Sequence, residues 1–498
     1  MKSQYMRIQG YFALIVMLMN GIKDDCSGQP THKSAEKESK MFQDLLDSKR
    51  YDELLEISQS IALTVEKDDI RSALSSYYGG VASFKMRKFK DSIKFFQNYR
   101  SSERLESLDE MAEFYWASNL LELDYKIPAL RSLDEFIEKY PDSYFYPEVI
   151  YRRASILFLL NKFDESIKSL EKLSSYKIGL DLKTRIHLLK GKSLMNLSRF
   201  AESEAEFLNA KILTQHSDQS YLNEALSYLV KLSNLQYRWD DSVSYYGEFN
   251  ETANSTVHKL NAAAYVMGSM EQMDRINDGI EGFEDILITL SVPFLHDSCY
   301  EAMSIYAGFL IKKYGHEKSI SRVGNLMSES SGNESLIEGL AMIGLEITEQ
   351  KNPKRSEEIR VYYESLVDRF RMNGLSNNSL LKIAKYFSTT NYEVARDYYN
   401  EVLKREDYEF SYSALLGLFK LYDAYEEIEL IDSVSSGLNS VFKINGMSFP
   451  SYLTPQDRDI IDNIIGSDLS SDDEVIIKEL DKLVFPKRSA IRRISKVN

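Results

Sequence analysis

The chain is poor in cysteine, proline, glycine and tryptophan. Its 498 residues include 2 cysteines, 9 prolines, 22 glycines and 2 tryptophans. The cysteines, Cys26 and Cys299, are too few for a disulfide framework or a thiolate metal site. Proline and glycine interrupt helices and supply turns, and both fall well below average usage. The composition therefore favours long helices joined by tight turns.

Motifs for catalysis and cofactor binding are also missing from the sequence. The 6 histidines are scattered singly, and none has a metal-ligand partner at helical spacing. There is no Gly-x-Gly-x-x-Gly after a strand pattern, no phosphate loop ending in Gly-Lys-Ser and no Gly-x-Ser-x-Gly elbow. We therefore expect a protein that is not an enzyme, holds no metal and uses no cofactor.

The net charge of −15, from 61 basic and 76 acidic residues, argues against general nucleic-acid binding. Such binding needs a basic face that displaces phosphate counterions. The tail 486–498 is basic without acidic residues, and it follows an acidic stretch. This tail is either a solvated helix end or an electrostatic contact for an acidic partner or anionic lipid.

What the chain does contain is a repeat with a step of 37 residues. Ser92, Ala129, Ser166 and Ser203 follow one another at this interval. The residue twelve positions before each is small, and the residue four positions after each is Phe or Leu. The small residues are Gly80, Ala117, Ala154 and Gly191, and the large ones are Phe96, Leu133, Leu170 and Phe207. A constant step in this range indicates stacked supersecondary units.

Each unit reads as two amphipathic helices around a short turn. In the third unit these are residues 148–160 and 163–173, with Ile167, Leu170 and Leu173 on one face of the second helix. Ser166 is expected where the two helices cross, because a large side chain there would force the backbones apart.

These motifs resemble the tetratricopeptide repeat. Serine replaces the usual alanine in three units, and the step is 37 rather than the family's 34. We expect the extra residues to lengthen the turn between units. The resemblance implies an all-α fold, a right-handed superhelical solenoid of about ten helix-turn-helix units.

The repeat is regular in one part of the chain and degenerate in another. We predict a flexible tether at 27–36, a regular array at 37–250, a degenerate array at 251–440, and a C-terminal helical cap with a basic tail at 441–498. Within the degenerate array the expected helix pairs are 262–270 with 280–286, 302–313 with 320–327, 336–347 with 359–370, and 380–387 with 392–399, and residues 413–422 open another unit.

The N-terminal segment 1–26 has the form of an export signal. Lys2 and Arg7 precede the apolar run Tyr11–Met19, which is too short to span a bilayer. Cleavage near Gly21 or retention as a membrane tether would both fit. Cys26 is a candidate lipidation site, although Lys23-Asp24-Asp25 departs from the small neutral residues of lipoprotein signals. A docking helix of a cytosolic protein is the alternative.

Residues 136–143 resemble the Phe-x-x-x-Tyr-Pro-x-Ser phrase of bacterial envelope repeats, found in outer-membrane assembly lipoproteins and periplasmic cell-division coordinating proteins. This resemblance covers residues 111–173. It implies the same compartment as the N-terminal pattern.

In such solenoids the first helix of each unit lines the concave face. Large side chains on the predicted first helices make a candidate groove for a protein or peptide partner. They are Tyr77, Phe84, Phe114, Leu121, Tyr151, Phe158, Leu188 and Met195. Arg152, Arg153, Tyr144 and Tyr146 are further candidates.

Three functions remain open on the sequence. The first is an exported scaffold of a bacterial cell envelope that binds proteins during envelope assembly or maintenance. The second is a cytosolic adaptor or regulator with the same fold. The third is an enzyme accessory that holds glycans or peptides through the aromatic groove.

Overall fold

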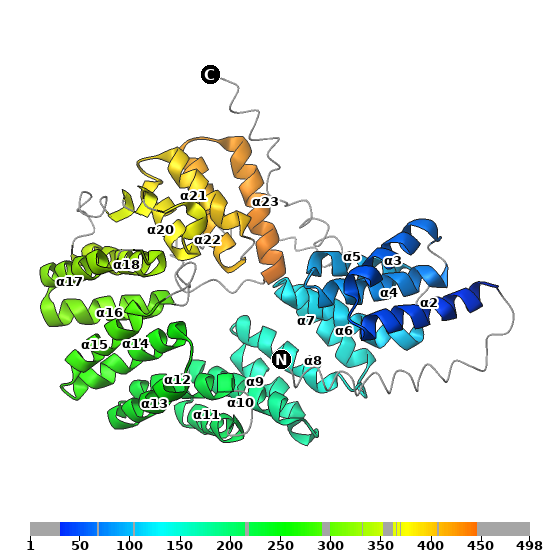
Figure 1. The fold of residues 1–498 in the computed structure, drawn as a ribbon, viewed down its shortest axis with the longest axis horizontal. Helices are drawn as coiled ribbons and strands as arrows, with labels where there is room; N and C mark the ends of the chain where they lie inside the picture. The colour runs from blue at the N-terminus through cyan, green and yellow to red at the C-terminus, as the bar shows by residue number, and fades with distance from the viewer. Residues whose placement is uncertain are drawn as a thin grey trace. The chain divides into compact units, whose positions relative to one another are not determined.

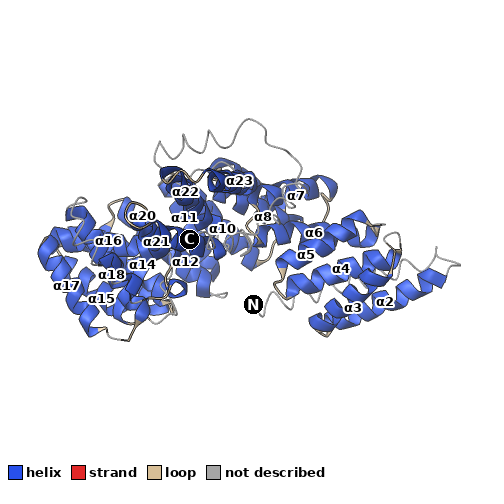
Figure 2. Cartoon of the chain, turned by 90° about the horizontal axis from the view of Figure 1, so that it is seen from above, coloured by secondary structure: helices blue, strands red, loops and turns tan. Residues whose placement is uncertain are grey.

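The computed structural model describes residues 30–66, 69–102, 105–214, 219–290, 299–330, 332–351, 362–364, 366–368, 370–405 and 408–445. Every regular element among them is a helix, and they contain no strand (Figure 2). The prediction of an all-α fold is confirmed. The segment 1–26 with Cys26, and all but the first residues of the segment 441–498, lie outside the described residues.

The chain divides into two compact units, Met1–Leu157 with Ile444–Gly446, and Phe158–Lys443 with Met447–Asn498. The helices that begin in the first unit are α2 (Pro30–Asp47), α3 (Tyr51–Thr64), α4 (Ile70–Lys85), α5 (Phe89–Ser101), α6 (Glu106–Glu122), α7 (Lys126–Lys139) and α8 (Tyr146–Leu159).

The second unit continues the series. Its first helices are α9 (Phe163–Glu171), η2 (Lys172–Ser175), α10 (Leu180–Asn196), α11 (Phe200–Thr214), α12 (Gln219–Leu235), α13 (Trp239–Thr252), α14 (Thr256–Gln272) and α15 (Ile276–Ile288). The later ones are α16 (Cys299–Tyr314), α17 (His316–Glu329), α18 (Glu334–Lys351), η3 (Met372–Gly374), α20 (Asn377–Phe387), α21 (Tyr392–Lys404), α22 (Tyr408–Ala424) and α23 (Ile428–Asn445).

Consecutive helices pack as hairpins, and the hairpins stack (Figure 1). In the first unit α4 pairs with α5 and α6 with α7; in the second α10 pairs with α11, α12 with α13, and α14 with α15. First helices also contact first helices of the next pair, as α10 contacts α12 and α12 contacts α14. The predicted tetratricopeptide-like stacking of helix pairs is therefore confirmed. The pairs expected at 262–270 with 280–286 and at 302–313 with 320–327 correspond to α14 with α15 and α16 with α17. Residues 359–361, 365 and 369 of the pair expected at 336–347 with 359–370 lie outside the described residues.

The turn inside most pairs is a recurrent left-handed cap. Eight non-glycine residues have φ between 57° and 60°, each just after a first helix: Lys49, Arg87, Asp124, Asn161, Ser198, Tyr237, Asp274 and Glu426. In the second pair, Lys88 N donates to Ser83 O at 2.8 Å and Arg87 N to Phe84 O at 2.9 Å. These are the bonds of a Schellman motif, which ends a helix and reverses the chain. These eight hairpins therefore share one turn geometry, whereas α16 and α17 are joined at Gly315 (φ 76°, ψ 165°) and the turn between α20 and α21 has no residue with positive φ.

The predicted crossing residue lies where the two helices of a pair meet. Ser92 Oγ donates to Gly80 O and Ser203 Oγ to Gly191 O, both at 2.8 Å, and Ser242 Oγ donates to Val230 O at 3.2 Å. Each pair of residues is twelve apart in the chain. Serine can therefore replace alanine here, because its hydroxyl finds a backbone acceptor in the facing helix rather than being buried alone.

The size of the side chains at the crossing is matched across the two helices. A Cβ added to Gly80 would lie 2.7 Å from the Phe96 ring, and one added to Gly191 would lie 2.7 Å from the Phe207 ring. Where alanine stands at the first position, leucine stands at the second, as in Ala117 with Leu133. At this crossing the motif therefore uses one of two combinations, glycine with phenylalanine or alanine with leucine, and either combination fills the space between the helices.

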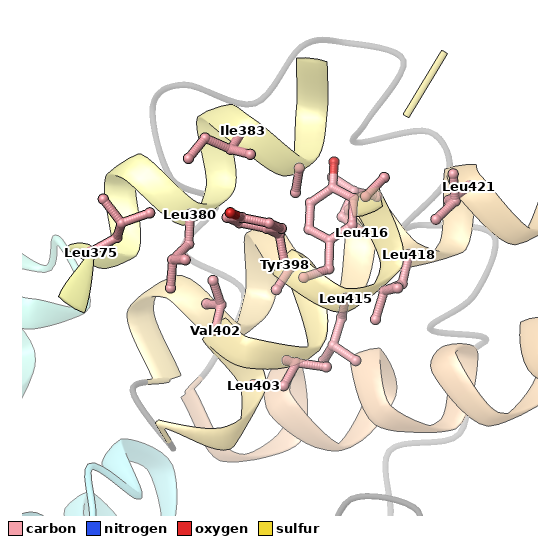
Figure 3. Close-up of a cluster of buried hydrophobic side chains, with 14 of the residues drawn as sticks. Leu375, Leu380, Ile383, Tyr398, Val402, Leu403, Leu415, Leu416, Leu418 and Leu421 are labelled. Carbon is pink, nitrogen blue, oxygen red and sulfur yellow. The ribbon is translucent and has the colours of Figure 1, made fainter. Parts of the chain in front are cut away.

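The later helices of the second unit share two large apolar cores. One gathers side chains of α14–α18, and the other joins α18 to α20, α21, α22 and α23. In the second core Leu380, Val402 and Leu416 converge from three successive helices (Figure 3). These cores account for the apolar patterning that remains where the repeat motif weakens.

A buried carboxylate connects α18 to the start of α20. Glu338 is fully buried and accepts from Ser376 N and Ser376 Oγ at 2.8 Å and from Ser379 Oγ at 2.5 Å. Ser376 is also the N-cap of α20, since its side chain accepts from Ser379 N. Glu338 therefore lies at the positive end of the α20 dipole, where a carboxylate is stabilised.

One local prediction changes in the structure. Helix α2 begins at Pro30, so residues 30–36, which were predicted to belong to a flexible tether, are helical. Proline fits the first turn of a helix because it needs no amide donor there, and Ala35 is already buried. The Tyr-Pro-x-Ser phrase marks the end of α7: Ser143 Oγ donates to Glu110 at 2.7 Å and accepts from Phe145 N at 2.9 Å.

The matched crossing predicts a compensating pair of substitutions. Gly80→Ala should lower the free energy of unfolding by roughly 1–3 kcal/mol, because the new methyl group overlaps the Phe96 ring. Phe96→Leu in the same chain should recover part of this loss, because it recreates the Ala117–Leu133 combination. Chemical denaturation of the two single variants and the double variant measures the coupling. Additive losses would contradict the packing argument.

Candidate interaction surface

The first helices of successive pairs form one continuous layer within each unit, which we call the first-helix face. It consists of α4 and α6 in the first unit and of α10, α12, α14 and α16 in the second. Of the predicted groove residues, Tyr77, Phe84, Phe114, Leu121 and Tyr151 belong to the first unit. Phe158, Leu188 and Met195 belong to the second.

Two of the predicted groove residues belong to the core. Tyr77 is 5% exposed and packs against Tyr78, Phe96 and Tyr99, and burial raises its pKa well above the usual value. Leu188 is 3% exposed and lies in the core of α10, α11 and α12. Both were predicted to lie on the surface because large apolar residues at helical spacing can face either the core or a partner. The structure corrects that assignment.

The other six predicted residues are half-buried: Phe84, Phe114, Leu121, Tyr151, Phe158 and Met195. The rings among them contact other rings. Phe84 contacts Tyr115 at 5.2 Å, Phe114 stacks on Phe145 at 4.6 Å, and Phe158 contacts Phe163 at 5.5 Å between centroids. These contacts hold the rings in place and leave part of each at the surface. Their use by a partner remains a prediction.

The sequence analysis missed a set of cation–aromatic contacts between neighbouring first helices. Lys192 of α10 lies 5.5 Å from the Tyr228 ring of α12, and Lys231 of α12 lies 4.4 Å from the Tyr265 ring of α14. In the first unit Lys85 of α4 lies 5.9 Å from the Tyr115 ring of α6. A cation over a ring adds roughly 0.5–2 kcal/mol. We call these contacts the cation–aromatic rungs.

The rung between α12 and α14 extends to α16. Lys231 Nζ lies 3.1 Å from the Tyr265 hydroxyl and 3.5 Å from Glu301 Oε1, and Tyr265 donates to Glu301 Oε2 at 2.9 Å. Burial and the Glu301 carboxylate raise the pKa of Tyr265 well above its usual value. The phenol therefore stays protonated and keeps its donor. Three consecutive first helices are joined on the surface by one polar network.

A second polar cluster lies between α10 and α11. The Glu206 carboxylate contacts His187 Nδ1 at 2.6 Å and Lys190 Nζ at 2.9 Å, and its side chain is 14% exposed. Burial alone would raise the pKa of Glu206, but hydrogen bonds from His187 and Lys190 and their charges outweigh burial and lower it. Glu206 is therefore ionised at neutral pH and holds the two basic side chains in position.

Two kinds of site are absent from the described residues. No group of three or more His, Cys, Asp or Glu side chains among them is arranged to hold a metal ion. In the same part of the chain, no helix combines the length and the apolar character needed to cross a membrane.

No family profile matches the sequence, and no curated protein matches it either. Among solved structures, the C-terminal part of a TPR repeat-containing protein from Cytophaga hutchinsonii is similar with a TM-score of 0.35 and 13% identity, covering 61% of this chain and 99% of that one.

A Rap protein complexed with competence and sporulation factor gives a TM-score of 0.35 and 11% identity, covering 76% of this chain and 99% of that one. The Cut9–Hcn1 hetero-tetramer of the APC/C gives 0.33 and 14%, covering 82% and 73%. At these low scores none of the structures assigns a partner or a function to this chain.

The Glu206 cluster predicts a pH-dependent contribution to stability. Glu206→Gln should lower the free energy of unfolding at pH 7 by roughly 1–3 kcal/mol, because it removes a charge that two basic groups contact. The wild-type contribution is present above the ordinary carboxyl pKa of 4.5 and is lost as pH falls through the lower folded-state pKa. Unfolding curves for both proteins should therefore converge at acidic pH. A difference that stays constant from pH 7 to acid would show that Glu206 acts through packing alone.

Proposed function

We propose that this chain is a non-enzymatic scaffold that binds protein partners through its first-helix face. The observation that supports this most strongly is the repetition of partly exposed rings and cation–aromatic rungs along consecutive first helices. Side chains of the same kind recur from one helix pair to the next, as Tyr228 and Tyr265 do. A stacked array of this type offers an extended surface rather than an enclosed site.

The chemistry of the face favours an extended peptide or an amphipathic helix as the bound segment. Half-buried rings such as Phe84 and Phe114 offer flat apolar area at low cost in side-chain entropy. The rungs add lysines to the same face, beside other rings such as Tyr228 and Tyr265, and the Glu301 carboxylate beside Tyr265. A segment with apolar anchors and polar groups between them would meet both kinds of side chain.

We further propose that the protein is exported and acts in a bacterial cell envelope, in its assembly or maintenance. The support for this comes from the sequence. Residues 1–26 have a basic start followed by the apolar run Tyr11–Met19, and residues 136–143 resemble the envelope-type phrase. Cys26 would serve as a membrane tether if it is lipidated. The alternative is a cytosolic adaptor in which the N-terminal segment is a docking helix.

Position-specific crosslinking tests the proposed binding face. Benzoylphenylalanine would replace Phe114 on α6 or Tyr265 on α14, both helices of the first-helix face. In the control it would replace Ile212, which is 61% exposed on the second helix α11. In the native cells, illumination should give discrete protein adducts from the two first-helix positions and few from Ile212, because the partner lies against the first-helix face. Adducts concentrated at Ile212, or equal at all three positions, would contradict the proposal.

The intact mass of the native protein tests the proposed compartment. An exported chain should be recovered from an envelope or periplasmic fraction, with a mass that corresponds to cleavage near Gly21 or to lipidated Cys26. A membrane-retained chain with an uncleaved N-terminus would also fit export. Recovery of an uncleaved chain from the cytosol alone would exclude export and favour the adaptor, while leaving the binding face untouched.

A further inference from the structure

A cavity of about 410 Å³ lies between the end of α9 and the side of α10. Its wall is formed by the last residues of α9, by η2, by the linker that follows η2, and by about two turns of α10, with Glu206 of α11 contributing at one side. This volume is within the range of pockets that bind a ligand of a few residues or a small molecule. The cavity lies entirely within the second unit.

The cavity coincides with a local departure from the repeat. Among the second helices described between 51 and 288, only α9 ends in a 3₁₀ turn, η2 (Lys172–Ser175). A 3₁₀ helix is narrower than an α-helix, because it has 3.0 rather than 3.6 residues per turn. The narrower end leaves room beside α10, and only Leu173 of the four η2 residues is buried. Tyr176 and Leu180 beside it are 40% and 53% exposed.

The floor of the cavity is apolar and its rim is basic. Leu170, Leu173 and Ile186 are buried beneath it, and Ile178 is half-buried at its edge. Lys177 and Lys183 line the rim, are exposed, and make no ion pair with any carboxylate of the described residues.

The charged side chains that line the cavity favour a carboxylate ligand over a phosphate. The lining contains Lys177, Lys183, Lys190 and His187 on one side and Glu171 and Glu206 on the other. Because Glu206 already contacts Lys190 and His187, the groups left for a ligand are the two rim lysines. The two carboxylates would repel a doubly charged phosphate, and the apolar floor would gain nothing from it. One carboxylate beside a bulky apolar group matches both the rim and the floor.

The geometry points to a peptide-binding site in which a bulky apolar side chain of a partner segment occupies the floor while a neighbouring carboxylate of the same segment contacts Lys177 and Lys183. This inference rests on the proposed scaffold function and adds a second point of contact to it, at the junction of two helix pairs rather than on the first-helix face. An anchor in a pocket beside an extended surface increases affinity by raising the effective concentration of the rest of the partner.

Selection from a phage-displayed library of linear nonapeptides tests the site. The target is the full chain, and the counter-target is the Lys177→Glu/Lys183→Glu variant. The enriched peptides should combine a bulky apolar residue with an adjacent Asp or Glu. Fluorescence anisotropy with one such labelled peptide should show an affinity at least about tenfold weaker for the double variant. Ile178→Ser should also weaken binding, because it makes the floor polar.

The matched control is Lys168→Glu, which reverses an exposed lysine on α9 that does not line the cavity. It should bind the peptide as the wild type does, and circular dichroism should show the same helix content in all variants. No enrichment over the counter-target would overturn the proposal. Equal loss in the Lys168→Glu control, or displacement of the peptide by millimolar inorganic phosphate, would also overturn it, since either would mean general anion attraction.

The outcomes separate this inference from the scaffold function. If first-helix positions still crosslink a partner in the Lys177→Glu/Lys183→Glu variant and no peptide is enriched, the cavity is not a binding site and the scaffold function stands. The opposite result is an enriched peptide whose binding depends on the rim lysines, together with no adducts from first-helix positions. In that case the cavity binds the segment, and the first-helix face is not the surface that the partner uses.

Discussion

The close crossing of the two helices in each pair is the constraint on which the rest of the structure depends. In the four units with the 37-residue step, one helix presents glycine or alanine at this point and the other presents serine or alanine twelve residues later. Where the second residue is serine, as at Ser92 and Ser203, its hydroxyl bonds a backbone carbonyl of the facing helix. Because the backbones are this close, the size of the large side chain four residues after the crossing must suit the small residue in the facing helix. Phe96 packs over Gly80, and leucine accompanies alanine. The left-handed turn fixes the direction in which the second helix returns.

The surface follows from this constraint. Because most of the hairpins share one turn, the first helices contact one another in sequence, and a lysine on one helix reaches a ring on the next. Two of the described places where the array departs from this regularity carry polar side chains. At η2 the altered turn opens a cavity with a basic rim. Between α18 and α20 the buried Glu338 caps the later helix, a connection that the repeat motif does not supply.

Much of the fold could be predicted from the sequence, because the determinants are local or recur at one interval. The crossing residues and most of the helix pairs were identified from spacing.

The candidate interaction surface was predicted less well. Tyr77 and Leu188 lie in the core because one position of error on a helix rotates a side chain by 100°. The cation–aromatic rungs escaped detection because their members are about 30–36 residues apart and the spacing varies. Nothing in residues 172–175 distinguishes a 3₁₀ turn from an α-helical one. The apolar stretch 336–347 contains two acidic residues, Glu338 and Glu346, and the sequence does not show which of them is buried.

Amide hydrogen exchange, followed by mass spectrometry on the full chain, tests the central role of the crossings most directly. If they hold the array together, the slowest-exchanging amides should cluster in the first-helix segments around Gly80, Ala117, Ala154, Gly191 and Val230, with faster exchange toward the ends of the same helices. Protection that is greatest in the large shared cores of α14–α23, with rapid exchange around the crossing residues, would contradict the account.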